Sequence, residues 1–278
     1  MRVGTNPLRV SSAPAQIQPV VLACIVHLPN QVGYHAKRME VVKTCLHSLK
    51  YNAGINASIA VWDNGSIPEL ANWIDTFIKP DIFIRSGNIG KNNASKMLFS
   101  MLPPQTLVSC SDDDMYHEPH WIKPQIDLFN HFPNVAAVSG YVVRTAFRWG
   151  CEFTKEWAIK NAKLRAYRAI PDKYEQDFCD SIGRDYAMHK EKTKNELDYV
   201  ISYKGVDAYA TSHHCQILGR AGILAECMEY DGQSMGGEQG FDIALDRVGL
   251  RLGTMARLTR HMGNVIDDKL RDEINVVK

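Results

Sequence analysis

Three adjacent carboxylates, Asp112, Asp113 and Asp114, follow the mostly apolar run 107–110. Carboxylates this close together repel one another unless a cation neutralises them. A hard divalent cation does so, taking carboxylate oxygens from alternate positions together with oxygens of a substrate phosphate. The triplet therefore predicts a site for a divalent cation. The alternative is that an aspartate only caps a helix over 115–130, because Asp is favoured at helix N-termini.

Two polar loops precede the triplet. The first, Asp63-Asn64-Gly65-Ser66, follows the apolar run 57–62, and its composition is also that of a simple turn. The second, 86–94, is rich in Gly and Asn and leads into a helical pattern, so its amides could face a phosphate or a ribose. Its spacing is that of neither a P-loop nor a dinucleotide fingerprint.

Two further groups lie towards the C-terminus. The first is the stretch Gly236-Gly237-Glu238, followed by Gln239 and Asp242. Its glycines would let the backbone approach a ligand, and its carboxylates could bind hydroxyls or accept a proton. His261 follows Arg260, and a late histidine after an acidic cluster is a candidate third metal ligand.

The segment 144–173 has an excess of basic side chains, among them Lys160, Lys163 and Arg165. A solvated helix face accounts for such an excess, and a cradle for an anionic acceptor is the functional alternative. The acceptor could then be a phosphorylated lipid, an acidic glycan or modified nucleic acid.

These groups must be positioned by alternating strands and helices. Apolar runs predict strands over 19–28, 57–62, 81–85 and 106–110, and helical spacing predicts helices over 35–50, 68–78 and 93–102. This order predicts an α/β fold with a mostly parallel central sheet. Ligands bind such sheets at the carboxyl ends of the strands, where Asp63 and Asp112 lie. The segment 144–204 lacks the alternation and indicates helices in pieces.

Composition is that of a folded globular protein. The 278 residues are 45% hydrophobic and 23% charged, with a formal net charge of +1. The seven cysteines show no C-x-x-C pair, which predicts reduced thiols in the core of a cytoplasmic protein. No run approaches the ~20 apolar residues of a membrane helix, so we expect no transmembrane anchor.

The ordered set of strand, Asp-Asn-Gly-Ser, Asn-x-Gly, Asp-x-Asp, Gly-Gly-Glu and a late His resembles the GT-A glycosyltransferases, especially family-2-like members. The Gly-Gly-Glu and Arg-His stretches also look like those of β-1,4-galactosyltransferases and polypeptide N-acetylgalactosaminyltransferases. The resemblance implies a Rossmann-like GT-A sheet with a helical acceptor-side insertion. It divides the chain into a loose leader (1–18), a nucleotide-sugar-binding half (19–143), an acceptor-binding and catalytic half (144–265) and a C-terminal tail (266–278).

Residue roles also follow from the resemblance. Asp112, Asp114 and His261 would be ligands of Mn²⁺ or Mg²⁺, and the catalytic groups would be Glu238 and Asp242. The acceptor would meet Gly237, Lys160, Lys163 and Arg165. The donor nucleotide-sugar would meet Leu28, Pro29, Asp63, Asn88, Gly90, Lys91, Asp112 and Asp113.

One position departs from the family pattern. Inverting members usually carry Glu-Asp where this chain has Glu238-Gln239, and Gln cannot take a proton near neutral pH. Either Glu238 or Asp242 acts as the base, or the enzyme retains configuration as relatives with Gly-Gly-Glu-Asn do.

The sequence thus predicts a metal-dependent glycosyltransferase using a nucleoside-diphosphate sugar, with UDP as the expected nucleotide, and a hydroxyl acceptor. Two alternatives stay open: a sugar-phosphate nucleotidyltransferase, and a non-catalytic domain that binds metal or nucleotide. The first normally carries a Gly-rich, Lys-bearing loop after the first strand, where this chain has His27-Leu28-Pro29. The second, built as a calcium module, lacks EF-hand spacing.

Overall fold

The structure, a computed structural model, describes residues 19–229 and 238–277. Within them the strands form a ten-stranded sheet, in the order β3-β2-β1-β4-β10-β6-β11-β9-β8-β7, and a separate pair, β12-β5. The strands are β1 (Val20–Val26), β2 (Ser58–Asn64), β3 (Ile82–Ser86), β4 (Leu107–Asp112), β5 (Met115–His117), β6 (Val135–Ser139), β7 (Lys163–Tyr167), β8 (Asp198–Tyr203), β9 (Val206–Tyr209), β10 (Gln216–Arg220), β11 (Leu250–Gly253) and β12 (Thr259–His261).

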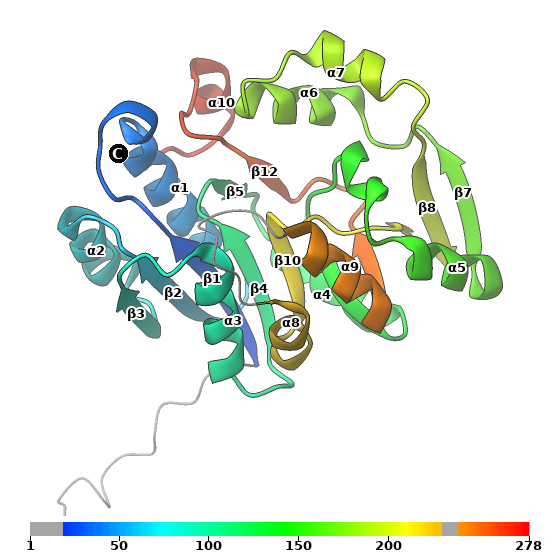
Figure 1. The fold of residues 1–278 in the computed structure, drawn as a ribbon, viewed down its shortest axis with the longest axis horizontal. Helices are drawn as coiled ribbons and strands as arrows, with labels where there is room; N and C mark the ends of the chain where they lie inside the picture. The colour runs from blue at the N-terminus through cyan, green and yellow to red at the C-terminus, as the bar shows by residue number, and fades with distance from the viewer. Residues whose placement is uncertain (1–18, 230–237, 278) are drawn as a thin grey trace, which may run out of the picture.

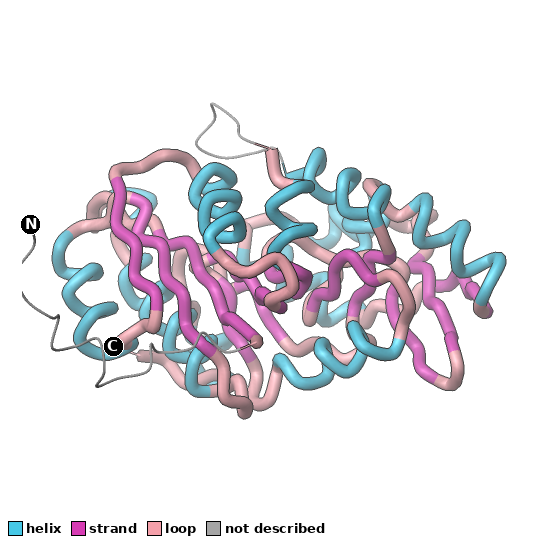
Figure 2. Tube along the Cα trace, turned by 90° about the horizontal axis from the view of Figure 1, so that it is seen from below, coloured by secondary structure: helices cyan, strands magenta, loops and turns pink. Residues whose placement is uncertain are grey.

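Helices cover the sheet on both faces (Figures 1 and 2). The α-helices are α1 (Arg38–Tyr51), α2 (Pro68–Trp73), α3 (Lys91–Met101), α4 (Ile122–His131), α5 (Glu152–Asn161), α6 (Asp172–Ser181), α7 (Tyr186–Lys192), α8 (Ala221–Cys227), α9 (Glu238–Val248) and α10 (Asp268–Glu273). Short 3₁₀ turns lie at η2 (Gly33–His35) and η4 (Arg144–Arg148), and α2 continues into a π-turn, η3 (Ile74–Ile78).

The N-terminal half has the parallel arrangement that the sequence predicts. β3, β2, β1 and β4 are neighbours in this order and run parallel, joined by α1, α2 and α3. Their carboxyl ends therefore meet at one edge of the sheet. The expected α/β class is confirmed.

The C-terminal half is mixed. β10 runs antiparallel to β4 and β6, and β9, β8 and β7 continue the sheet as antiparallel strands. The segment expected to be helical in pieces, 144–204, holds α5, α6 and α7 but also contributes β7 and β8. The sequence shows no apolar run for β7, because it is an edge strand whose residues are largely exposed, and β8 is its partner.

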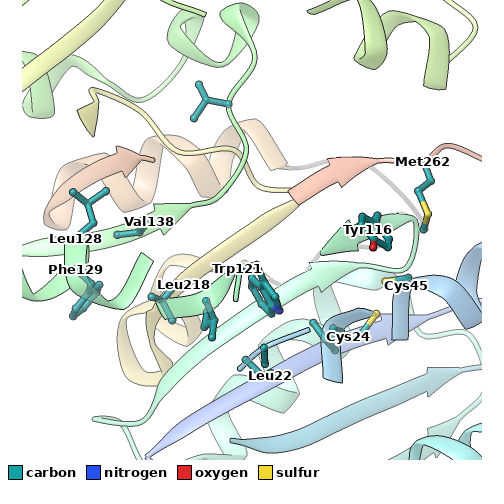
Figure 3. Close-up of a cluster of buried hydrophobic side chains, with 14 of the residues drawn as sticks. Leu22, Cys24, Cys45, Tyr116, Trp121, Leu128, Phe129, Val138, Leu218 and Met262 are labelled. Atoms are coloured by element: carbon teal, nitrogen blue, oxygen red, sulfur yellow. The ribbon is translucent and has the colours of Figure 1, made fainter. Parts of the chain in front are cut away.

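The core lies in two layers, and β1 shows why. Its side chains alternate, with Leu22, Cys24 and Val26 facing α1, α2 and α4, and Val21, Ala23 and Ile25 facing α3, α8 and α9. Figure 3 shows part of the first layer, where Leu22 and Leu218 lie around the fully buried Trp121. All seven cysteines are buried free thiols, as the sequence predicts.

In the part of the chain that the structure describes, no helix is both long and apolar enough to cross a membrane.

Candidate functional site

The acidic triplet lies on a tight connection between two strands. β4 ends at Asp112, and β5 begins at Met115, so the expected helix over 115–130 starts only at Ile122. Helix capping therefore does not account for the carboxylates. β5 pairs antiparallel with β12, and this register places His261 opposite Met115. As a result His261 Nε2 lies 3.6 Å from Asp114 Oδ2.

Asp113 is the structural member of the triplet. It is 7% exposed, and its two oxygens accept hydrogen bonds from the guanidinium of Arg38, at the start of α1, and from the backbone N–H of His27. Burial lowers the pKa of Arg38, but the negative charges of Asp113 and Asp114 outweigh burial and raise this pKa above its ordinary value. Asp113 was expected to contact the donor, but it does not line the cavity described below.

Asp112 is paired with Lys91, the first residue of α3. Lys91 Nζ lies 2.7 Å from Asp112 Oδ1 and 3.8 Å from Glu238 Oε1. Burial lowers the pKa of Lys91, yet the neighbouring acidic groups, Asp112 foremost, together outweigh burial and raise this pKa, so the amine stays protonated. Lys91 thus links the end of β4 to the start of α9.

Asp114 is the carboxylate with free coordinating capacity. Its Oδ2 lies 3.5 Å from Arg38 Nη1, while its Oδ1 is buried and has no hydrogen-bond partner in the part of the chain described. A buried, unpaired carboxylate oxygen is costly unless a cation or a donor occupies the adjoining space. His261 is oriented by a second contact, because its Nδ1 lies 2.8 Å from Ser181 Oγ. These side chains fit a divalent cation.

A cavity of about 620 Å³ adjoins these groups. It is lined by Lys91, Asp112, Asp114, His214, Glu238 and His261, together with residues of α6, α10 and the loop between β12 and α10. This volume is within the range of small-molecule sites. Tyr141 also lines it, and the buried hydroxyl of this residue has no hydrogen-bond partner among the described residues.

The part of the cavity wall formed by α6 is fixed by a buried charge network. Arg144 donates to Asp198 at 2.9 Å and lies 3.7 Å from Glu175 of α6, which contacts His189 of α7 at 2.8 Å. Both acids and Arg144 are at most 1% exposed. This network ties α6, and with it Ser181, to the sheet.

The polar loops of the N-terminal half meet at the carboxyl ends of β1, β2 and β3. Asn64 Oδ1 accepts from Ile89 N at 2.9 Å, and Asn64 Nδ2 donates to Asn88 Oδ1 at 3.1 Å. Asp63 accepts from Ser66 N at 2.8 Å and is also 3.4 Å from Arg85. Of the residues expected at the donor, Lys91 and Asp112 line the cavity, whereas five others do not: Leu28, Pro29, Asp63, Asn88 and Gly90.

The structure separates the residues expected at the acceptor from the cavity. Lys160 lies in the last turn of α5, and Lys163 and Arg165 lie on β7, the last strand of the sheet, whereas β4 is the fourth. Arg165 is also paired with Asp207 at 2.6 Å. None of the three lines the cavity. Gly237 lies outside the described residues.

Asp242 is held away from the cavity. It is 5% exposed, and its oxygens contact Arg251 Nη2 at 2.6 Å and His214 Nδ1 at 3.0 Å.

The sequence pattern missed two partners of the site, Arg38 and His214. Each lies in a segment without a motif of its own, and only the contact across the fold identifies it.

A model described as glycosyl transferase family 2 matches residues 32–190, more than half of the chain. The match includes Asp63, Asn88 and the acidic triplet and ends before Glu238 and His261. No curated protein matches the chain.

Solved structures also match. One is "GalNAc-T7 with UDP, GalNAc and Mn2+", at 13% identity and a TM-score of 0.47, covering 87% of this chain and 42% of that one. Another is a mannosyltransferase from Pyrobaculum calidifontis in complex with GDP-Man and Mn2+, at 16% identity and a TM-score of 0.31, covering 51% of this chain and 41% of that one. This chain therefore spans less than half the length of either. The family model, matching the segment that carries the triplet, shows that the chain belongs to glycosyl transferase family 2.

Proposed function

We propose that the chain is a metal-dependent glycosyltransferase that moves a hexose-type sugar from a nucleoside-diphosphate sugar, with UDP as the expected nucleotide, to a hydroxyl group. One observation carries the proposal. Asp114 has a buried oxygen without a partner among the described residues, 3.6 Å separates its other oxygen from His261, and both side chains line a cavity with Asp112. This is a set of oxygen and nitrogen ligands open to a small molecule.

Asp112, Asp114 and His261 would hold Mn²⁺ or Mg²⁺. Such an ion supplies Lewis-acid stabilisation of the negative charge that develops on a departing diphosphate. The chain contributes the rest. Lys91 adds a fixed positive charge beside Asp112, and α6 orients His261 through Ser181. Sugar and acceptor held together in one cavity gain the orientation that transfer requires.

The acceptor class follows from the charges of the cavity wall. Each basic side chain there already has an acidic partner: Lys91 with Asp112, Arg257 with Asp177 at 2.8 Å, Lys269 with Asp177 at 3.1 Å and Arg260 with Glu273 at 2.5 Å. The described wall thus offers an anionic acceptor no unpaired Lys or Arg. This favours a neutral hydroxyl acceptor over the anionic one that the basic segment suggested.

A panel of nucleotide-sugars tests the proposal. The protein is incubated with each donor and Mn²⁺, and release of the free nucleoside diphosphate is measured with and without EDTA. We expect release with at least one donor, abolished by EDTA. Exchange of pyrophosphate into the nucleotide would instead identify a nucleotidyltransferase. Binding of metal without any turnover would identify a non-catalytic domain.

A further inference from the structure

The candidate site has an unusual distribution of proton acceptors. Gln239 occupies the position where a carboxylate base is expected, and Asp242, one turn further along α9, has both oxygens engaged. Arg251, its partner on β11, is fully buried and is itself held by Ser212 O at 2.6 Å and Gly150 O at 2.5 Å. Asp242 is therefore fixed in place and closed to substrate.

His214 connects Asp242 to the cavity. Its side chain is 30% exposed and lines the cavity, and its Nδ1 lies 3.0 Å from Asp242 Oδ2. An ionised carboxylate only accepts hydrogen bonds, so Nδ1 carries the proton and donates it to Asp242. The lone pair is then on Nε2. Among the described residues Nε2 has no hydrogen-bond partner, so it is free to meet a ligand in the cavity.

The ring of His214 is held in one orientation. It stacks on His213, with ring centroids 4.6 Å apart and an angle of 26° between the planes. His213 is buried, and burial together with the neighbouring His214 keeps the pKa of His213 well below its ordinary value, so His213 is neutral. A base oriented by a buried carboxylate is an arrangement suited to proton transfer.

The charged groups that line the cavity with His214, or that contact Asp242, include residues of five elements. Asp242 and Glu238 lie on α9, Arg251 on β11 and Lys91 on α3, while Asp112 ends β4 and His261 ends β12. Glu238 is the competing base, but its Oε1 lies 3.8 Å from Lys91 Nζ, and this ion pair engages the carboxylate. In the described part of the chain, His214 has no Lys or Arg as a direct partner.

We propose that His214, oriented by Asp242, is the base that takes the proton of the attacking hydroxyl. The inference rests on the proposed function. The hydroxyl oxygen forms a bond to the anomeric carbon, and the bond from that carbon to the diphosphate oxygen breaks. The hydroxyl proton passes to Nε2 of His214, and the bonding electrons leave with the nucleoside diphosphate. Asp242 stabilises the positive charge that the ring acquires.

The test uses the donor that the nucleotide-sugar panel identifies, with water as the attacking hydroxyl compound. His214→Asn keeps an amide near the position of Nδ1, able to donate to Asp242, but removes Nε2. We expect kcat to fall at least about 100-fold, the usual scale for loss of a general base. The acid limb of the kcat–pH profile should disappear, and calorimetric affinity for the nucleoside diphosphate with Mn²⁺ should stay within about 3-fold. His47→Asn, on α1 and away from the cavity, is the matched control.

Three results would overturn the proposal. If His214→Asn keeps kcat within about 3-fold of the unaltered chain while Glu238→Gln loses it, Glu238 is the base. If His214→Asn loses Mn²⁺-dependent nucleotide binding, His214 is a metal ligand. If the unaltered chain shows no metal-dependent turnover with any donor, the proposed function fails together with this inference.

Discussion

At the acidic turn, neighbouring residues of the same type have different environments. Asp113 is buried against Arg38, Asp112 is paired with Lys91, and Asp114 keeps an oxygen that no described residue contacts, beside His261. Arg38 and Lys91 reduce the repulsion among the three carboxylates and leave one charge open to a cation. The turn is therefore pre-formed, and a metal has to neutralise only part of its charge.

Removing Arg38 should destabilise the fold. Arg38 and Asp113 are each 10% exposed in their side chains, so Arg38→Met leaves a buried carboxylate without its partner. We expect a loss of about 3 kcal/mol in the free energy of unfolding, measured in urea. The double variant Arg38→Met/Asp113→Asn should recover most of this loss. A loss below about 0.5 kcal/mol for Arg38→Met would show that the pair does not hold the turn.

The sequence led to the prediction that the triplet binds a cation, because three adjacent carboxylates after a buried strand repel one another until a positive charge lies between them. It could not indicate which of them is structural. That distinction depends on Arg38, which lies 75 positions away from Asp113 and has no motif around it. In the same way Gln239 pointed to a missing base, but only the contact between His214 and Asp242 supplies a candidate.

At the scale of elements, the site depends on strand ends and the loops that follow them. The four N-terminal strands and three helices were predictable because each has a clear apolar period. β5, β7 and β8 were not. β5 has three residues and pairs with β12, far along the chain, while β7 and β8 pair with each other at the edge of the sheet, where β7 is largely exposed. β5 matters most, since its pairing with β12 brings His261 to Asp114.

β5 also contributes a pH-dependent part of the stability. Burial lowers the pKa of His117 to about 3, and its ring nitrogens contact Ser48 Oγ at 3.2 Å and Ser111 Oγ at 3.0 Å. An unfolded histidine has a pKa of about 6.5, so between that pH and the folded pKa of about 3 the unfolded chain binds the proton more readily than the folded one. Stability should fall as the pH drops, by about 2 kcal/mol from this ring by pH ~5. His117→Gln should show a shallower pH dependence in urea unfolding, and an unchanged slope would refute the assignment.

The contact between the two polar loops leaves no room at Gly65. Its φ is +86°, and an added Cβ would lie 2.9 Å from the backbone nitrogen of Asn88. Gly65→Ala should cost at least about 1–2 kcal/mol of stability, because the loops must move apart. Gly87→Ala, in the same region but with open space around its Cβ, is the matched control. Equal behaviour of the two variants would contradict this packing.

For the whole molecule, the sheet separates two charged regions. The acidic turn and the cavity lie at the fourth strand, and the basic residues first associated with the acceptor lie at the ninth-to-tenth strand edge, on β7 and the end of α5. An excess of basic residues in the sequence shows neither where their side chains lie in the fold nor whether they are paired with acids. Here Arg165 is bound to Asp207, and the cavity is lined instead by ion pairs of α6, α10 and the segment before β12.

Neutralising Lys160, Lys163 and Arg165 together should leave transfer almost unchanged, because these side chains do not line the cavity. We expect kcat/KM to stay within about 3-fold of that of the unaltered chain, because surface charges act weakly at a distance. Steady-state kinetics at two salt concentrations measure this. A loss of kcat/KM above about 10-fold, matched by a similar loss in the unaltered chain at high salt, would instead support an anionic acceptor.

The central claim is that Asp114, with Asp112 and His261, binds the cation that holds the donor diphosphate. Calorimetric titration of the nucleoside diphosphate tests it most directly, with and without Mn²⁺, in the unaltered chain and in Asp114→Asn. The account predicts that Mn²⁺ strengthens binding at least about 100-fold in the unaltered chain and has little effect in Asp114→Asn, whose stability should be near normal. Equal affinity with and without Mn²⁺ in the unaltered chain, or full metal enhancement in Asp114→Asn, would contradict it.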